Sequence, residues 1–252
     1  MAAKRPRKTK KTTRAASGLA KKVSVKTITK QAVAQRRKQR LFAFRRRLHN
    51  ESINSITHGI GTGMTLSGTA LLIAKSVASS DMVMLISAAV YGLCMSLVFL
   101  ASTLYHSMMK PRPKHFFLLM DHAAIFLAIA GTYTPICLLL LRNSVGYALL
   151  GAVWLMAICG ILFKTRYINR YQFVSTLIYV VMGWSILIAI RSFTAAMPNQ
   201  GLILFFFGGG MYTCGTLFYG WRTLPYHHMI WHLFVLAGAT LHFMSLYLFV
   251  FK

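Results

Sequence analysis

The sequence predicts an all-α membrane protein, a bundle of seven transmembrane helices, and three observations support this prediction. Hydrophobic residues make up 56% of the 252 residues. They are concentrated in segments of about 20 residues, the length that an α-helix needs to cross the hydrocarbon core of a bilayer. Only three acids accompany 29 Lys and Arg residues, and most of the basic residues lie outside these segments. This pattern is typical of a multi-pass membrane protein and excludes a soluble globular domain.

Seven apolar segments are long enough to span the membrane. Prolines separate several of them: Pro111, Pro113, Pro198 and Pro225 lie between segments, whereas Pro135 lies inside one. At Pro135 we expect a kink whose freed carbonyl groups are bonded by Ser or Thr hydroxyls. The predicted spans are, in order, residues 55–76, 83–107, 116–140, 145–163, 172–191, 202–220 and 229–251.

The N-terminal part of the chain differs sharply from the rest. Residues 1–50 contain 18 of the 29 basic residues and no acid. We therefore predict a basic, largely disordered cytoplasmic tail over residues 1–48 and a seven-helix membrane domain over residues 49–252. A polybasic run beside a membrane helix favours contact with anionic lipid, so we expect lipid rather than a specific nucleic acid as its partner.

The basic residues also predict the orientation of the helices. With the tail inside the cell, only four basic residues, Lys75, Arg142, Arg191 and Lys252, fall on the outer side, and the other 25 of the 29 fall on the inner side. The positive-inside rule then places the N-terminus in the cytoplasm and the C-terminus outside.

Polar side chains gather at the cytoplasmic ends of several predicted helices. His106 ends the second span, Asp121 lies near the start of the third, and His228 and His232 begin the seventh. His228 and His232 share one face because they are four residues apart on a helix. Ionisable residues at membrane depth are costly, so their shared position predicts one functional site.

The three histidines predict a zinc site. His106, His228 and His232 supply the usual number of protein ligands for a catalytic Zn²⁺, which leaves a fourth position for water. His227 is an alternative to His228 as the ligand. His242 is excluded because it lies ten residues beyond His232, about 15 Å deeper along the helix. The simpler alternative is that these side chains only hydrogen-bond to backbone or lipid phosphate groups.

Two further residues suit a hydrolytic site. Asp121 could orient a water molecule at the metal and accept its proton as a general base. Ser102 lies four residues before His106, on the same helix face, and its hydroxyl could donate a hydrogen bond to a developing oxyanion. Glu51, Asn54 and His58 line one face of the first span. We expect them to form a hydrogen-bonded lock between helices near the metal, although a second polar site is also consistent with the spacing.

Five motifs resemble the hemolysin III family, which is grouped with the adiponectin and progestin receptors and is distantly related to alkaline ceramidases. The resemblance covers about residues 49–251 in motif order but not the basic tail. The motifs are Glu51-Ser-Ile-Asn54-Ser-Ile-Thr-His58-Gly59, Ser102-Thr-Leu-Tyr-His106, Asp121-His122, Gly131-Thr-Tyr-Thr-Pro135 and His228-Met-Ile-Trp-His232-Leu-Phe-Val-Leu-Ala-Gly238.

The resemblance implies a seven-helix bundle with Zn²⁺ held at His106, His228 and His232, with Asp121 and Ser102 beside it. It implies an integral, multi-pass protein of a bacterial inner membrane. The function that we expect is hydrolysis of an amide or ester bond in a lipid-like substrate. The alternatives are a pore-forming, cytolytic protein and a receptor-like sensor with structural zinc.

The orientation is directly testable. A reporter enzyme that is active only in the cytoplasm, fused after Lys252, should be inactive, whereas a reporter that is active only outside the cytoplasm should work there. The same pair of reporters inserted in the loop near Lys110 should give the opposite result. Cytoplasmic activity at Lys252 would contradict the seven-span arrangement.

Overall fold

The computed structural model describes residues 10–168 and 170–252, and side chains from residue 31 onward within these ranges. Every regular element in them is helical, and no strand occurs in the described part of the chain. The chain divides into two compact units, residues 1–49 and 50–252. We describe each unit separately.

The first unit is helical where it is described. Helix α1 runs from Lys10 to Ala78. The disorder that the composition predicts for residues 1–48 stays a prediction, and residues 1–9 lie outside the described residues. A helix is possible here because Lys, Arg, Gln and Ala are strong helix formers. The side chains of residues 31–47 are exposed, so intrinsic helix propensity rather than a packed face accounts for the helix.

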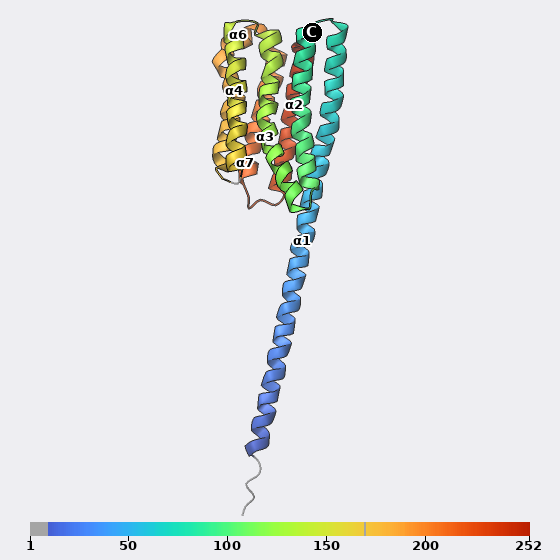
Figure 1. Cartoon of the computed structure of the whole chain (residues 1–252), viewed down its shortest axis with the longest axis vertical. Helices are drawn as coiled ribbons and strands as arrows, with labels where there is room; N and C mark the ends of the chain where they lie inside the picture. Colours follow the sequence, from blue (N-terminus) through green and yellow to red (C-terminus); the bar gives the residue numbers. More distant parts are fainter. Residues whose placement is uncertain (1–9, 169) are drawn as a thin grey trace, which may run out of the picture. The chain divides into compact units, whose positions relative to one another are not determined.

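The second unit is a bundle formed by the part of α1 from residue 50 onward and by the helices that follow. In Figure 1 these helices run side by side, with short connections at the two ends of the bundle and the C-terminus at one of them. The elements are α2 (Met82–Ser107), α3 (Pro111–Pro135), η1 (Ile136–Leu140), α4 (Ser144–Tyr167), α5 (Gln172–Gly183), η2 (Trp184–Ala189), α6 (Ile190–Ala196), α7 (Asn199–Gly220) and α8 (His227–Phe249).

Among the described residues, six helical segments are long and apolar enough to cross a membrane. This confirms a helical membrane protein, whereas the count of seven spans and the orientation stay predictions. The segments are Met82–Ser107, Pro111–Leu140, Ser144–Tyr167, Gln172–Ala196, Asn199–Gly220 and His227–Phe249.

The first predicted span, residues 55–76, is not among these six because it is rich in Gly, Ser and Thr and contains Lys75. It nevertheless packs inside the bundle through polar contacts. Ser55 Oγ donates to the carbonyl oxygen of Thr103 in α2 at 3.3 Å, and Lys75 Nζ donates to the carbonyl oxygen of Tyr247 in α8 at 3.1 Å. These bonds place this part of α1 against both α2 and α8.

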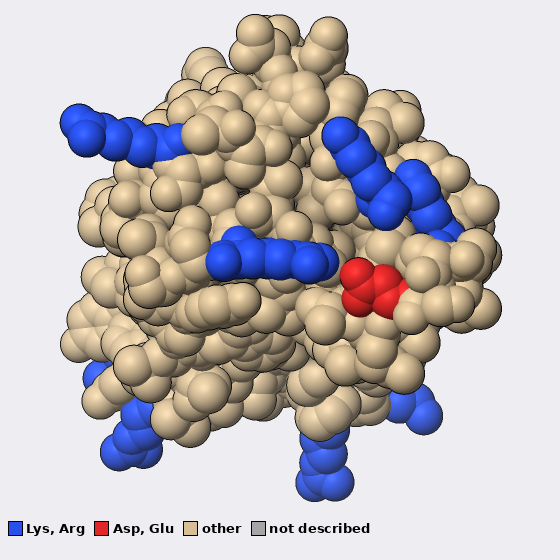
Figure 2. Space-filling view, turned by 90° about the horizontal axis from the view of Figure 1, so that it is seen from above, with Lys and Arg blue, Asp and Glu red and all other residues tan. Residues whose placement is uncertain are grey.

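The end of the bundle that carries the C-terminus has few charged groups. Figure 2 looks onto this end and shows a mostly uncharged surface with separate basic side chains and a small acidic area. Asp81 is the acid between α1 and α2, and it caps α2 by accepting from the backbone N–H groups of Val83 and Met84 at 2.8 and 3.1 Å. The Nη2 atom of Arg142 lies 3.7 Å from Oδ2 of Asp81. This acid therefore has a structural role.

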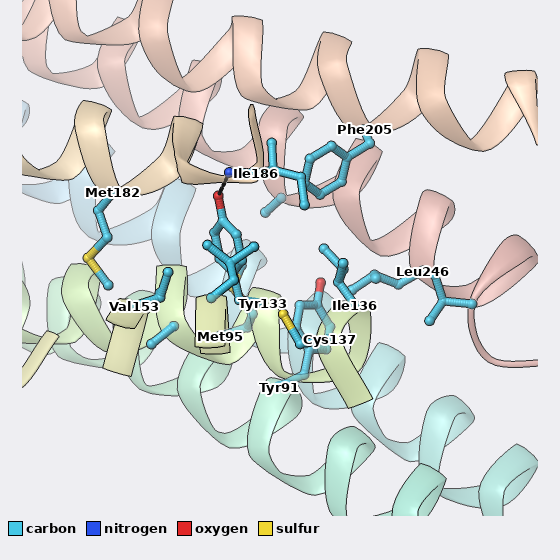
Figure 3. Packing of buried hydrophobic residues seen from close by; sticks show 14 of the residues in the cluster. Tyr91, Met95, Tyr133, Ile136, Cys137, Val153, Met182, Ile186, Phe205 and Leu246 are labelled. Atoms are coloured by element: carbon cyan, nitrogen blue, oxygen red, sulfur yellow. Dashed lines mark hydrogen bonds between the residues drawn. The ribbon is translucent and has the colours of Figure 1, made fainter. Parts of the chain in front are cut away.

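Irregular backbone inside the bundle is stabilised by Tyr133. Pro135 ends α3 and is followed by the π-helical turn η1, as expected for a proline that lacks an N–H group. Figure 3 shows Tyr133 pointing toward Ile186, where α5 has given way to the 3₁₀ turn η2. The Tyr133 hydroxyl donates to the carbonyl oxygen of Gly183 at 2.7 Å and accepts from the N–H of Ile186 at 2.8 Å. One side chain thus satisfies two backbone groups at the break.

Removing this hydroxyl should destabilise the bundle. We expect Tyr133→Phe to lower the free energy of unfolding by about 1–3 kcal/mol, because it leaves the buried N–H of Ile186 without a partner and removes the bond to the carbonyl oxygen of Gly183. Thermal unfolding of the purified protein in detergent would measure this. Tyr147→Phe is the matched control, since Tyr147 is 53% exposed. Equal melting temperatures for the two variants would contradict the role assigned to Tyr133.

Candidate metal centre and cavity

The structure brings the three predicted histidines together. His106 comes from the last turn of α2, and His228 and His232 come from the first two turns of α8. One ring nitrogen from each lies within 4.8 Å of the others, and the three form a potential metal-binding group. His228 Nε2 and His106 Nε2 are 3.2 Å apart. The open choice between His227 and His228 is therefore decided in favour of His228 by position.

One spacing in the cluster matches that of two ligands on a tetrahedral ion. With zinc–nitrogen bonds of about 2.0–2.1 Å, two nitrogens on a tetrahedral ion are about 3.3–3.4 Å apart. The spacing between His106 and His228 is close to this value. His106 and His232 are buried, so the donors are largely shielded from competing water. Three neutral imidazoles are a donor set that suits zinc and several other divalent metals.

Glu51 sets the orientation of His106. His106 Nδ1 donates to Glu51 Oε2 at 2.7 Å, and Lys114 Nζ donates to Glu51 Oε1 at 2.9 Å. Burial by itself would raise the pKa of Glu51, but the hydrogen bonds from His106 and Lys114 lower this pKa to about 2. The carboxylate is therefore ionised at neutral pH. With the proton held on Nδ1, the Nε2 lone pair of His106 faces the cluster, an arrangement common among metal-binding histidines.

His58 supports a second member of the cluster. Its ring stacks on that of His232 with the centroids 3.5 Å apart and the planes 18° apart, and it meets Phe99 edge-on at 5.0 Å. His58 is 4% exposed, and in the described chain neither of its ring nitrogens has a hydrogen-bond partner. The lock predicted for Glu51 and His58 thus takes the form of contacts with two of the clustered histidines.

Asp121 and Ser102 lie beside the cluster. Asp121 is in α3, close enough to Ser102 and His106 for electrostatic interaction, and its Oδ2 is 4.0 Å from His122 Nδ1. Ser102 is 1% exposed, and its Oγ makes no hydrogen bond of standard length within the described chain. Both side chains line the same cavity. A buried hydroxyl without a partner is available to bind a ligand.

The cavity has a volume of about 440 Å³. This is within the range of about 300–1,000 Å³ typical of small-molecule sites. The histidine cluster, Ser102 and Asp121 form part of its wall. Apolar side chains such as Met95, Ile129 and Phe205 form much of the rest. The cavity could therefore hold an amphipathic molecule with its polar part near the histidines.

His242 lies apart from the cluster, as its position in the sequence predicts. It is buried, stacks on Phe205 with the centroids 4.6 Å apart, and its Nε2 bonds to the Phe205 carbonyl oxygen at 3.0 Å. It lines the cavity but is not in the potential metal-binding group. Its imidazole joins α8 to α7.

Comparisons with known proteins agree with the motifs. A family model described as Haemolysin-III related matches residues 46–243. Hemolysin-3 of Bacillus cereus is 40% identical over 200 residues, which cover 79% of this chain and 91% of that protein. The Hemolysin-3 homolog of Bacillus subtilis is 39% identical, covering 78% and 92%. The human Monocyte to macrophage differentiation factor is 27% identical over 210 residues, covering 81% and 86%. The matched range contains every residue of the cluster.

The cluster predicts how metal content responds to substitution. His106→Ala, His228→Ala and His232→Ala should each remove most of the metal that the purified protein takes up when zinc is supplied, because two ligands make an incomplete site. Glu51→Gln should retain the ligands but weaken zinc binding by about 10- to 100-fold, since the ring of His106 loses its charged partner. Elemental analysis and zinc titration of the purified, folded protein would measure both effects.

His242→Ala is the control, because it removes a buried histidine of the same helix that lies outside the cluster. Loss of zinc from this variant, with zinc kept in the other three, would show that the metal binds elsewhere.

Proposed function

Because the chain belongs to the Haemolysin-III related family of multi-pass membrane proteins, we propose that it is a zinc-dependent hydrolase of amide or ester bonds in lipids, acting in a bacterial inner membrane. One observation carries the proposal: the three clustered histidines lie on the wall of a cavity that also holds the hydroxyl of Ser102 and the carboxylate of Asp121. A structural metal site has no need of either group.

His106, His228 and His232 would hold the metal. A zinc ion bound there would supply Lewis acidity and lower the pKa of a bound water molecule toward neutral pH. Glu51 keeps the proton of His106 on Nδ1, so that Nε2 is free to bind. His58 restrains His232 by ring stacking. These contacts hold two of the three ligands before any metal arrives.

The remaining polar groups act on the substrate and on water. Asp121 accepts a proton from the attacking water as a general base. Ser102 donates its hydroxyl hydrogen to the substrate carbonyl oxygen as that atom gains negative charge. The apolar side of the cavity, including Met95 and Ile129, receives a hydrocarbon chain and limits the access of bulk water. A lipid that enters from the bilayer has both the carbonyl group and the hydrocarbon chain that such a cavity would bind.

The basic tail has a separate role in this proposal. Residues 1–48 would bind anionic lipid at the inner surface, because each Lys or Arg near a negatively charged leaflet contributes about 1 kcal/mol. The exposure of residues 31–47 is consistent with such contact.

A cytolytic function is the second candidate, favoured by the name of the Bacillus cereus relative, Hemolysin-3. A pore through one chain needs a polar path along its whole length. Most of the surface of this cavity is instead apolar, although polar side chains such as Lys164, Ser175 and Thr176 form part of the lining. A pore would therefore have to form between several copies of the chain.

Replacing Asp121 separates the two functions. Asp121→Asn should keep the fold and the bound zinc but reduce lipid hydrolysis by at least ~100-fold, because a general base contributes about 10²- to 10⁴-fold. Hydrolysis is measured with a panel of ceramide-like and phospholipid substrates. Asp81→Asn is the matched control, since Asp81 caps α2 at the opposite end of the bundle.

The same preparations should be tested for dye release from liposomes, with and without a metal chelator. Hydrolysis that both the chelator and Asp121→Asn abolish would support the enzyme. Dye release that neither treatment changes, with no lipid in the panel cleaved, would favour the cytolytic function and reject the hydrolase.

A further inference from the structure

Lys164 is a buried cation that the proposed mechanism does not use. It lies in the last turn of α4 and is 1% exposed. Among the Lys and Arg residues whose side chains the structure describes, it is the one that is buried. Arg166, two residues further along the same helix, is exposed. A lysine near a helix end usually extends its ammonium group to the membrane surface, and Lys164 does not.

The packing of α4 explains this inward position. Gly160 lies one turn before Lys164, and a side chain there would collide with the ring of Phe126 in α3. The absence of a side chain at Gly160 lets α4 approach α3 closely. Lys164, on the same face one turn later, is thereby held between helices instead of at the bundle surface.

Lys164 has no negative partner in the described chain. The protein has only three acids. Glu51 pairs with His106 and Lys114, Asp81 pairs with Arg142, and Asp121 lies nearest to His122. An unpaired ammonium group inside a membrane protein is expensive, so such residues usually mark a ligand or ion pathway.

The surroundings of Lys164 belong to the cavity. Lys164 lines it together with Ser175 and Thr176 of α5, and it interacts electrostatically with His122, the neighbour of Asp121. The cavity lining also includes Arg222, which is exposed and donates to Gln172 Oε1 at 2.8 Å. Two cations, Lys164 and Arg222, and several hydroxyl groups thus line one part of the cavity. This part is formed by α4, α5 and the end of α7. Only one carboxylate, that of Asp121, is part of the lining.

We propose that Lys164 selects lipids that carry an anionic group, a phosphate or a carboxylate, separate from the bond to be cleaved. The anion pairs with Lys164 while the apolar chain lies along Met95, Ile129 and Phe205. The histidine cluster and Lys164 then hold different parts of one molecule, because they come from different helices that contribute to one cavity. This inference rests on the proposed function for the bond that is cleaved, but its anion site can be tested by binding alone.

The test compares three ligands of equal chain length on the purified, zinc-loaded full chain: hexadecyl phosphate, palmitate and hexadecanol. Affinities are measured in one uncharged detergent at fixed concentration. At least one of the two anions should bind about 10- to 100-fold more tightly than the alcohol, the range expected for a charged hydrogen-bonded pair. Lys164→Met should remove this preference without changing the affinity for hexadecanol or the zinc content. Lys164→Arg should retain it.

Arg166→Gln is the matched control, because it removes an exposed basic residue of the same helix. The relative affinities of hexadecyl phosphate and palmitate identify whether the anion is a phosphate or a carboxylate. Equal affinity of the unsubstituted protein for all three ligands would overturn the inference, even if Lys164→Met fails to fold. Displacement of hexadecyl phosphate by inorganic phosphate at equal concentration would also overturn it. The hydrocarbon chain of the ligand would then contribute nothing to binding.

The binding and cleavage measurements together test the anion site separately from the proposed hydrolase function. Anion binding that depends on Lys164, without cleavage of any lipid, supports the inference and rejects the hydrolase. Cleavage of neutral and anionic lipids at equal rates, with no effect of Lys164→Met, rejects the inference and leaves the hydrolase standing.

Discussion

The hydrogen bond between His106 and Glu51 is the interaction on which the site depends. The membrane interior offers no water to a buried polar group, so each such group needs a partner from another helix. Both ring nitrogens of His106 have such a partner. Nδ1 bonds to Glu51 of α1, and Nε2 faces His228 of α8. Lys114 of α3 completes the pairing of Glu51. The same contacts therefore join four helices and position ring nitrogens of the histidine cluster.

Polar groups in this protein fall into two sets. Those that stabilise the fold are satisfied: Asp81 caps α2, and Tyr133 bonds two backbone groups where α5 meets η2. A second set, part of it beside the cavity, is not: the Ser102 hydroxyl and both ring nitrogens of His58 make no hydrogen bond of standard length in the described chain. Leaving a buried polar group unbonded costs about 1–3 kcal/mol. The unbonded groups that line the cavity are available for a ligand there.

The cavity is lined both by the histidine cluster and by the buried cation Lys164. The histidine cluster comes from α2 and α8, and Lys164 comes from α4, with Asp121 of α3 also lining the cavity. The family comparison covers residues 46–243 and so includes all of these positions. Metal-binding imidazoles, a carboxylate and an ammonium group in one largely apolar space suit an amphipathic molecule better than water or ions. This is why we propose a lipid as the ligand of the cavity.

The sequence alone determined the fold class, the family and the helix ends at which polar residues gather, because hydrophobic length, basic loops and motif spacing are local properties. It also indicated the members of the metal-binding group, since His228 and His232 must share a helix face. It predicted disorder in the basic tail, residues 1–48, whereas the structure describes α1 as helical from Lys10 onward. Only the tertiary structure decided that Glu51 orients His106, that His58 stacks on His232 and that Lys164 is buried. These contacts join residues far apart in the chain, and their partners depend on how closely the helices approach, which no local pattern records.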